Sequence, residues 1–346
     1  MRILVGMSGG IDSTYAALKL IKEGHEVEGA VLLMHEYTEV ESAKAAATSL
    51  SIPLHVIDAT ELFRQRVIPN FLTEYTSART PNPCIVCNAE VKFRCLCDFA
   101  AQNGFDAIAT GHYAAVKNVG SADLPRYAIA QAADKTKDQS YMLYRLTDDI
   151  LSVLCLPLSG MSKAEIREQA REAGIYAADK ADSQEICFIP DGDYAAYIEA
   201  ACGASPEGDF VDMDGNVLGR HKGLIHYTVG QRKGLGVSAG ARIFVTDIDP
   251  VTNRITLAYD AAPVLNFEVT SPVFSGDVPL SAGEKRRYQV KLRYRATPVP
   301  CTVSMSDDGR VLVALDVPQR AVAAGQSAVF YSNGTVMMGG FITPIK

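Results

Sequence analysis

"RILVGMSGGIDSTYAALKLIKEG", residues 2–24, decides the fold of this chain. Its beginning, "RILVGM" (2–7), is a short apolar run typical of a buried strand. Residues 14–23 have the pattern of a helix that stops at Gly24. The junction "GMSGGIDS" (6–13) therefore connects a strand directly to the start of a helix.

This junction has the composition of a phosphate-binding loop. Gly9 and Gly10 allow the backbone to approach a polyanion, and Ser8 and Ser13 add hydroxyl donors at the positive end of the helix. Asp12 has two interpretations, a helix cap or a magnesium ligand. The loop lacks the Gly-Lys-Ser/Thr of the Walker motif. The alternative is a glycine turn that binds no ligand. So complete a match to a phosphate-binding loop at a strand-to-helix junction disfavours this alternative.

Strands and helices continue to alternate as far as residue 113. The expected strands after the first are 27–34, 53–59 and 105–113, and the expected helices are 14–23, 41–50, 61–78 and 88–103. This alternation predicts an α/β fold with a doubly wound parallel sheet. Ligands of such sheets bind at the carboxyl ends of the strands.

The sequence pattern changes near residue 205. Short apolar, often β-branched runs separated by Gly, Asp, Asn and Pro then replace the helical pattern, which is typical of small barrels or sandwiches. A second boundary near 264 divides this half in two. We expect a catalytic domain over 1–204, a small β domain over 205–263 and a β-barrel-like domain over 264–346.

Composition fits an ordinary globular protein of several domains. The chain has 346 residues, of which 48% are hydrophobic and 21% charged, and a net charge of −7. Two segments oppose the acidic average, 219–236 and 284–295, and predict either an anionic partner on one face or a solvated basic surface. The chain shows neither a secretory signal nor an apolar run of the roughly 18 residues that a membrane span needs, so we expect no membrane partner and a cytoplasmic location.

The pair Cys84 and Cys87 stands out among eight cysteines. In a reducing compartment a close pair indicates a metal site or catalysis rather than a disulfide. Cys87 directly precedes Asn88, a good helix cap, so we expect a helix N-terminus to lower the pKa of its thiol. A zinc site made by Cys84, Cys87, Cys95 and Cys97 is a weaker alternative.

The loop "SGGIDS" (8–13) resembles the PP-loop of ATP pyrophosphatase-type enzymes, whose fold is that of the adenine nucleotide α-hydrolases. The resemblance then extends along the whole chain to the tRNA-specific 2-thiouridylase family. It rests on motifs that appear in order: "TPNPCIVCN" (80–88), "TGHY" (110–113), "KDQSYMLY" (137–144), "DSQEICFI" (182–189), "HYTVGQRKGLG" (226–236), "RYRATPVPCTV" (293–303) and "GQSAVFY" (325–331).

The resemblance implies an ATP- and Mg²⁺-dependent reaction on tRNA. The enzyme adenylates the C2 oxygen of the wobble uridine of Lys, Glu and Gln tRNAs, and sulfur then displaces AMP. The other product is diphosphate, and the sulfur comes from a cysteine desulfurase or a sulfur-carrier protein. Alternatives are a PP-loop amide ligase acting on a small molecule and a non-catalytic RNA-binding protein.

The resemblance also implies residue roles. Cys87 matches the catalytic nucleophile and Cys187 the carrier of the persulfide, although the apolar surroundings of Cys187 in the sequence predict a buried structural thiol. Many relatives have Asp where this chain has Cys84, which puts a proton-transfer role in doubt. The third thiol leaves open a [4Fe–4S] cluster held by Cys84, Cys87 and Cys187.

Binding residues follow from the resemblance in the same way. The implied ATP contacts are Gly6, Met7, Ser8, Gly9, Gly10, Ile11, Asp12, Ser13, Met34 and Gly111. The target base is lined by Asn82, Pro83 and Cys84. The implied contacts to the rest of the tRNA are His112, Lys137, Asp138, Gln139, Arg293, Tyr294 and Gln326.

Overall fold

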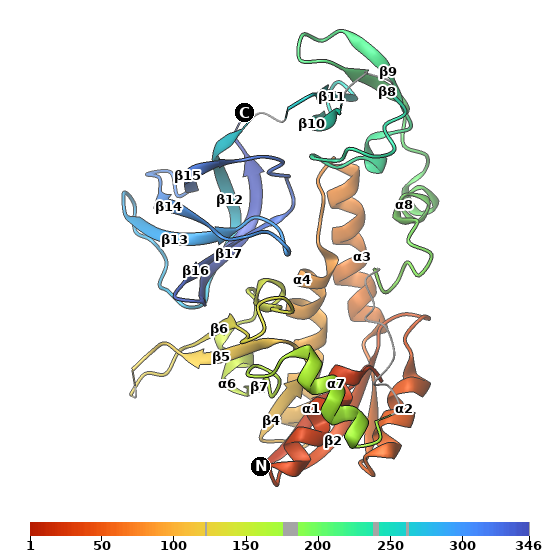
Figure 1. Cartoon of the computed structure of the whole chain (residues 1–346), viewed down its shortest axis with the longest axis vertical. Helices are drawn as coiled ribbons and strands as arrows, with labels where there is room; N and C mark the ends of the chain where they lie inside the picture. Colours follow the sequence, from red (N-terminus) through yellow and green to blue (C-terminus); the bar gives the residue numbers. More distant parts are fainter. Residues whose placement is uncertain (122, 176–185, 238–241, 261–262, 346) are drawn as a thin grey trace.

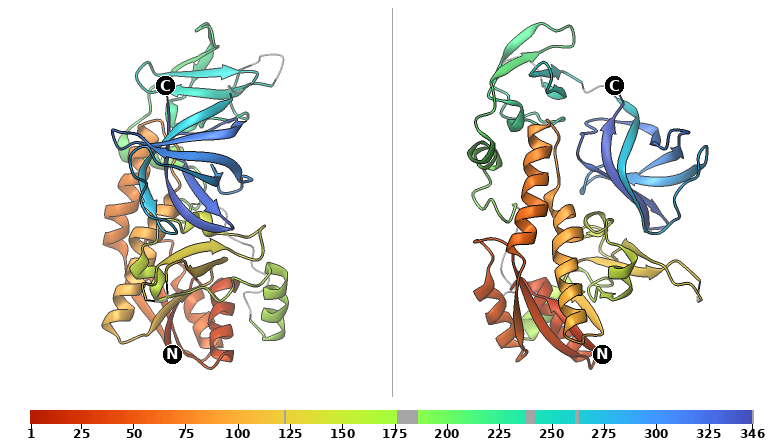
Figure 2. Two further views of the ribbon diagram at one scale, coloured as in Figure 1. Left: turned by 90° about the vertical axis from the view of Figure 1, so that its left-hand side faces the viewer. Right: turned by 180° about the vertical axis from the view of Figure 1, so that it is seen from behind.

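The structure is a computed structural model that describes residues 1–121, 123–175, 186–237, 242–260 and 263–345. Figure 1 shows an elongated molecule with the parallel sheet and its helices at the end that holds the N-terminus. Two β structures occupy the other end. The helix α3 (Thr60–Thr76) runs between the two ends, as the rear view in Figure 2 also shows.

The first strand forms the centre of a parallel sheet. Within the described residues the sheet has five strands in the order β3-β2-β1-β4-β7, and every neighbouring pair is parallel. The strands are β1 (Arg2–Gly6), β2 (Glu26–Leu33), β3 (Leu54–Asp58), β4 (Ala107–Thr110) and β7 (Leu154–Cys155). The chain order reverses between β1 and β4, which places a ligand crevice at their carboxyl ends.

Helices cover both faces of this sheet, which confirms the doubly wound prediction. Ile3 and Val5 of β1 pack with α1 (Ile11–Lys22) and α2 (Val40–Ser49). Leu4 of β1 and Ile108 of β4 belong to the core that contains α3 and α5 (Phe93–Gln102). Alternate residues of one strand thus face two different helical layers.

The helix expected at 88–103 begins earlier than predicted. The chain turns into α4 (Pro83–Cys87), continues through one π-helical turn, η1 (Asn88–Lys92), and then enters α5. Asn82, not Asn88, is the cap, because its side chain accepts a hydrogen bond from the N–H of Cys84 at 3.2 Å. Pro83 then supplies the fixed φ of a first helical position.

The C-terminal part forms a barrel that is extended by the hairpin β5–β6 from the N-terminal half of the chain. An eight-stranded sheet has the order β12-β15-β14-β13-β16-β17-β6-β5, and the pairing of β12 with β17 closes its first six strands into a ring. Its strands are β5 (Ala114–Asn118), β6 (Tyr127–Gln131), β12 (Val264–Phe274), β13 (Lys285–Lys291), β14 (Val299–Met305), β15 (Val311–Gln319), β16 (Ser327–Ser332) and β17 (Thr335–Pro344).

The remaining elements complete the two ends of the molecule. A four-stranded sheet in the order β10-β11-β8-β9 contains β8 (Gly208–Val211), β9 (Val217–His221), β10 (Phe244–Asp249) and β11 (Arg254–Ala258). The short helices are η2 (Ser140–Met142), α6 (Asp148–Ser152), α7 (Lys163–Glu172), α8 (Tyr194–Cys202) and η4 (Leu224–His226). In these described residues, no helix has the length and apolarity required to cross a bilayer.

Candidate active site

The predicted phosphate loop forms the turn between β1 and α1. Gly10 is the N-cap of α1 and has no side-chain cap. The Ser8 N–H donates to Ser13 Oγ at 3.1 Å, and the hydroxyl of Ser13 donates to the Gly10 carbonyl at 3.1 Å. These bonds hold the loop against the helix start, where backbone N–H groups attract anions.

Two glycines allow close backbone approaches at this loop. Gly9 has φ +76°, and a Cβ at this position would lie 2.5 Å from backbone and side-chain carbon of Ser42 in α2. Gly111, directly after β4, would place a Cβ 2.6 Å from the backbone of Asp12 and Ser13. The segment after β4 therefore packs on the first turn of α1, at the crevice between β1 and β4.

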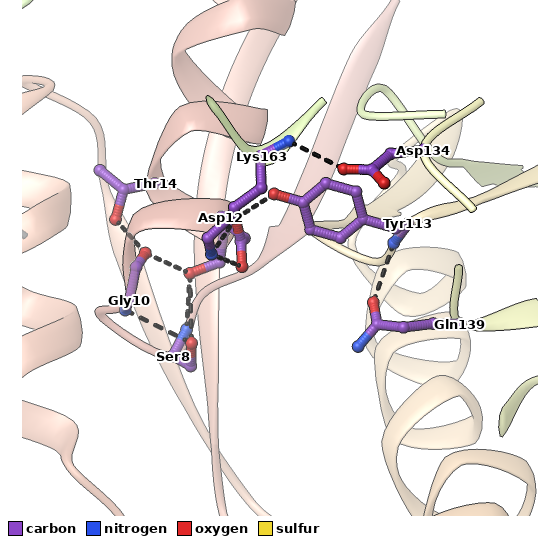
Figure 3. A network of polar contacts seen from close by, with 9 residues as sticks. Ser8, Gly10, Asp12, Thr14, Tyr113, Asp134, Gln139 and Lys163 are labelled. Carbon is purple, nitrogen blue, oxygen red and sulfur yellow. Dashed lines mark hydrogen bonds and ion pairs between the residues drawn. The ribbon is translucent and has the colours of Figure 1, made fainter. Parts of the chain in front are cut away.

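A buried lysine that sequence analysis missed holds the loop carboxylate. Figure 3 shows Lys163, at the start of α7, directed toward Asp12, with its Nζ 2.9 and 2.7 Å from the two carboxylate oxygens. The Tyr113 hydroxyl donates to the same carboxylate at 2.6 Å. Asp12 is thus paired with Lys163 and does not cap α1. The "SKAE" capping box predicts this helix start, but not its meeting with a residue 151 positions away.

The predicted tRNA contacts at 137–139 include side chains that hold internal structure. Gln139 accepts a hydrogen bond from the Tyr113 N–H at 2.9 Å through its side-chain oxygen (Figure 3). Asp138 is buried and accepts hydrogen bonds from the N–H groups of Ala132 and Ser140, both at 3.2 Å. These bonds fix the loop that precedes η2. Contact between this loop and tRNA stays a prediction.

Cys87 lies beside the expected adenine contact. Its Sγ is 3.8 Å from Sδ of Met34, which follows β2. The expectation of a lowered thiol pKa is wrong, because burial raises the pKa of Cys87 to about 12. Cys87 is 4% exposed and lies inside a continuous helical stretch, because α4 passes directly into η1 and α5. The N-terminus of this stretch is at Pro83, so it does not stabilise the thiolate of Cys87.

Cys187 has the opposite exposure. Its side chain is exposed, which makes the prediction of a buried structural thiol wrong. Desolvation by neighbouring protein still raises the pKa of this thiol, while Lys92 lowers it. Cys187 and Cys87 interact electrostatically, so the structure brings together two thiols a hundred positions apart. The rest of the motif at 182–185 lies outside the described residues.

The thiols do not form a metal site in the described part of the chain. Cys84 is exposed, and Cys95 and Cys97 are half-buried within α5. No group of three or more His, Cys, Asp or Glu side chains in that part is arranged to hold a metal ion. The zinc interpretation is therefore wrong for these four cysteines, and the iron–sulfur cluster stays a prediction.

The segment expected to line the target base is anchored by the barrel. Gln326 donates from its side chain to the Thr80 carbonyl at 2.7 Å, and the Thr80 N–H donates to the Ala324 carbonyl at 2.9 Å. Asn82 also donates to Sδ of Met142 at 3.4 Å. Gln326 thus positions the chain just before Asn82 and Pro83.

The basic segment 284–295 is less available than its composition predicts. Arg286 forms ion pairs with Asp277 and Glu284, and Arg287 pairs with Asp316. Arg293 donates to the carbonyls of Val229 and Ala321 at 2.9 and 2.7 Å, which ties the four-stranded sheet region to the barrel. Tyr294 lies partly buried with its ring centroid 6.2 Å from that of Tyr141.

His112 follows Gly111 and is held within the crevice. Its Nδ1 is 2.9 Å from Oγ1 of Thr110, and its ring centroid is 5.5 Å from that of Phe93. Burial, assisted by the charge of Lys92, lowers the pKa of His112 to about 3. The imidazole is therefore neutral at physiological pH.

A cavity of about 350 Å³ opens beside Met34. It lies between the end of β2, helix α3 and the segment that begins at Phe188, and its lining includes Met34, His35, Phe63, Phe188 and Tyr197. Both ring nitrogens of His35 are buried without a hydrogen-bond partner, and burial lowers the pKa of this imidazole. The apolar part of the wall suits a planar base, and charged lining residues such as Glu36, Arg64 and Asp191 add polar groups to the same cavity.

Comparison with known proteins covers nearly all of the chain. Family models described as tRNA methyl transferase HUP domain, tRNA methyl transferase PRC-barrel domain and Aminomethyltransferase beta-barrel domain match residues 1–191, 195–259 and 265–342. A relative from Clostridium botulinum named tRNA-specific 2-thiouridylase MnmA is 42% identical over 99% of this chain and 98% of its own length. Relatives of the same name from Clostridium acetobutylicum and Acetivibrio thermocellus are each 40% identical over 99% of both chains. The chain therefore belongs to the tRNA-specific 2-thiouridylase family.

Proposed function

We propose that this protein is a tRNA-uridine 2-sulfurtransferase that uses ATP to replace the C2 oxygen of the wobble uridine of Lys, Glu and Gln tRNAs with sulfur. The observation that carries the proposal is the placement of Cys87 against Met34. A thiol then lies beside the expected nucleotide, at the same sheet edge as the phosphate loop. Activation and sulfur transfer require this proximity, because the adenylated base must stay where sulfur reaches it.

The phosphate loop handles the first half of the reaction. Backbone N–H groups after Gly9 and the hydroxyls of Ser8 and Ser13 bind phosphate oxygens of ATP. Asp12 offers carboxylate oxygens of the kind that Mg²⁺ prefers, and the ion when bound neutralises phosphate charge. Lys163 lies within hydrogen-bond distance of the same carboxylate and adds a positive charge beside the loop. The uridine C2 oxygen attacks the α-phosphate of ATP, and diphosphate leaves.

The second half uses the two thiols in different ways. The exposed Cys187 receives sulfur as a persulfide from a cysteine desulfurase or a sulfur carrier. Its outer sulfur attacks C2 and forms a C–S bond, while the C–O bond breaks and AMP leaves with the electron pair. The Cys87 thiolate then attacks Sγ of Cys187, and the electrons of the broken S–S bond stay on the tRNA sulfur. The resulting Cys87–Cys187 disulfide needs a dithiol reductant before the next turnover.

The exposures of the cysteines support this persulfide route over a [4Fe–4S] cluster. Cys84 and Cys187 are exposed, whereas Cys87 is buried as a thiol, which suits sulfur transfer between thiols with separate roles. Cys84 then lines the target base with Asn82 and Pro83. We expect Cys84→Ser to keep substantial activity.

Binding of tRNA involves both ends of the molecule. We assign the catalytic domain to 1–204, the small β domain to 205–263 and the barrel to 264–346, a division supported by the separate four-stranded sheet and barrel. Tyr294 and Gln326 lie on the side of the barrel that faces the catalytic domain, since both contact its residues. We expect the reaction to take place in the cytoplasm, where the tRNA substrate and the sulfur donor meet.

The test measures sulfur in tRNA directly. Unmodified tRNA is incubated with the protein, ATP, Mg²⁺, a reductant and a persulfide donor, and 2-thiouridine is quantified by mass spectrometry of the nucleosides. We expect one AMP released per sulfur incorporated. Cys87→Ser and Cys187→Ser should abolish incorporation while tRNA still binds, and Cys202→Ser serves as the control thiol. ATP cleavage with a small-molecule amine and no sulfur in tRNA would favour an amide ligase.

A further inference from the structure

A second cavity, of about 260 Å³, lies where α3 and the stretch from α4 to η1 meet the barrel. Arg66 and Asn70 of α3 line one side of it, and Val86 of α4 and Glu90 of η1 line another. Phe341 of β17 lines the side of the barrel. The phosphate loop and the two proposed sulfur-carrying thiols are not part of this cavity.

Helix α3 separates this cavity from the one beside Met34. The α3 residues 60, 63, 64 and 68 line the cavity beside Met34, whereas 65, 66, 69 and 70 line the second cavity. At about 100° per residue, the two sets occupy opposite sides of the helix. The segment that begins directly after Cys187 lines only the cavity beside Met34. A ligand of the second cavity therefore binds on the other side of α3 from that segment.

Arg145 lines the second cavity and is held in place by the barrel. Its Cζ lies 5.0 Å from the centroid of the Phe341 ring, and its Nη1 donates to the Ser271 carbonyl at 3.3 Å. The hydroxyl of the preceding Tyr144 lies 3.1 Å from Oγ of Ser327, which is paired with Phe341 between β16 and β17. A guanidinium stacked on an aromatic ring keeps further N–H groups available to bind an anion.

The charges of the second cavity match a phosphodiester. Arg66 and Arg145 form no ion pair with a carboxylate in the part of the chain that the structure describes. Glu90 lines the same cavity and offsets one of the two positive charges. A phosphodiester carries a single negative charge, whereas a phosphate monoester carries about 1.5–2. The Phe341 ring beside these cations is a group on which a nucleotide base stacks.

The second cavity is close to the segment expected to line the target base. Val86 follows Pro83 by three positions in α4, a rise of about 4.5 Å along the helix. On the side of the barrel, the strand partner of Phe341 is Ser327, which directly follows Gln326, the anchor of the same segment. A nucleotide next to the target uridine is therefore the part of a tRNA that reaches this cavity.

We propose that the second cavity binds a nucleotide of the anticodon loop adjacent to the target uridine. Arg66 and Arg145 hold its phosphodiester, and Phe341 contacts its base or ribose. The inference rests on the proposed function, because it takes tRNA as the substrate. Phosphate contacts fix the position of the anticodon loop while the target base is turned out of the stack. The cavity thus contributes to tRNA affinity without contacting ATP.

Two alternatives give these side chains other roles. In the first, Arg145 only joins the barrel to the preceding domain through Phe341 and Ser271, and its replacement lowers the free energy of unfolding without affecting a particular phosphate. In the second, the cavity receives an acidic segment of the sulfur-donor protein. The three roles separate when single charges are removed from the protein and from the tRNA.

The experiment measures tRNA binding by fluorescence anisotropy in the absence of ATP and sulfur donor. The double variant Arg66→Met, Arg145→Met should bind tRNA about tenfold more weakly, because it loses hydrogen bonds to a charged group. It should also reduce the slope of log K against log salt by about one. Arg145→Lys keeps the charge and should retain most of the slope. Arg94→Met, at an exposed position of α5 outside the cavity, is the matched control and should bind like the wild type.

Uncharged methylphosphonate linkages locate the phosphate. Placed singly in the anticodon loop on either side of the target uridine, one such linkage should weaken wild-type binding by about tenfold and have no further effect on the double variant, since both changes remove the same contact. Should the double variant fail to fold, Arg66→Met alone gives the same comparison at an exposed position.

Four outcomes would overturn the proposal. Folded variants that bind tRNA with wild-type affinity and salt slope would exclude a phosphate contact. Losses that add at every linkage would mean that the arginines act only on the fold. Wild-type tRNA affinity with slower loading of Cys187 by a persulfide-donor protein would assign the cavity to the donor. A wild-type protein that does not bind tRNA would overturn the proposed function as well, so the two failures are distinguishable.

Discussion

At the scale of single residues, the two proposed sulfur-carrying thiols have opposite surroundings. Cys187 is exposed, as loading by another protein requires, whereas Cys87 is buried against Met34. A buried thiol resists modification by small oxidants until substrate chemistry presents a sulfur to attack. This difference supports the proposal that Cys187 is loaded with sulfur and that Cys87 resolves the resulting disulfide bond.

Gly111→Ala tests the close approach beside the phosphate loop. The added Cβ would meet the backbone of Asp12 and Ser13 at 2.6 Å, so the first turn of α1 must move away from β4. Overpacking of this kind costs about 1–3 kcal/mol, and we expect ATP affinity to fall by about tenfold or more. Isothermal titration calorimetry with ATP measures this affinity. Gly160→Ala is the control because no atom lies within 4 Å of its Cβ, and equal ATP affinities in the two variants would contradict the geometry.

The burial of His112 leads us to expect that the free energy of unfolding decreases in acid. Its pKa is lowered to about 3 in the folded state, so the unfolded state binds the extra proton and folding is disfavoured as pH falls below the usual histidine pKa. Near pH 5 this linkage costs about 2 kcal/mol. Urea unfolding of His112→Gln near pH 7 and pH 5 should show a pH dependence smaller by about that amount. If the free energy of unfolding of the variant depended on pH as in the wild type, His112 would not be a buried, neutral imidazole in the folded state.

The sequence predicted the position of the phosphate loop between a strand and a helix better than the burial and pKa values of the candidate site residues. The loop at 6–13 was recognisable because its glycines and serines act through local backbone geometry. The raised pKa of Cys87 could not be predicted from the sequence. It depends on burial by residues distant in the chain and on a helix that starts at Pro83. Lys163 was missed for a similar reason, since nothing local to α7 indicates that it pairs with Asp12.

At the scale of elements, the parallel sheet and its helices were predictable and the hairpin β5–β6 was not. The strands β1, β2 and β3 are each followed by a helix, so the local alternation specifies the layers of this part of the sheet. The hairpin joins the barrel through the pairing of Ala130 with Thr335, a contact between distant parts of the chain. The π-helical turn also escapes sequence patterns, because its extra residue is fixed by packing on both sides.

Gln326→Met tests the anchor between the barrel and the segment before α4. It removes the bond to the Thr80 carbonyl, which costs about 1 kcal/mol and loosens the residues expected to line the target base. We expect the KM for tRNA to rise several-fold with unchanged ATP affinity. Gln319→Met, whose amide bonds carbonyls within its own strand, is the control. A fall in ATP affinity equal to the change for tRNA would contradict a local role for this anchor.

At the scale of the whole molecule, internal ion pairs decide which of the basic side chains are available to a partner. The chain carries −7 overall, and Arg286 and Arg287 of its most basic segment are engaged with acids of the barrel. Lys285 and Arg295 are exposed and have no ion-pair partner within the described residues. They are the charges of this segment most available to tRNA phosphates.

Salt dependence of tRNA binding tests this distinction. Each phosphate contact contributes counterion release, so Lys285→Ala and Arg295→Ala should each reduce the slope of log K against log salt by about one. Arg287→Ala, whose charge is paired with Asp316, should reduce it less. Fluorescence anisotropy with labelled tRNA at several salt concentrations gives the slopes. Equal slopes in the wild type and a Lys285→Ala, Arg295→Ala double variant would place the tRNA elsewhere.

The central claim is that sulfur reaches the tRNA through Cys187 and leaves a disulfide with Cys87. A single-turnover experiment loads Cys187 with a sulfur-34 persulfide, removes excess donor and adds ATP, Mg²⁺ and unmodified tRNA without reductant. Mass spectrometry should find sulfur-34 in 2-thiouridine and an equal amount of the Cys87–Cys187 disulfide peptide. Release of AMP with the label still on Cys187, or labelled tRNA with Cys87 still a free thiol, would contradict the account.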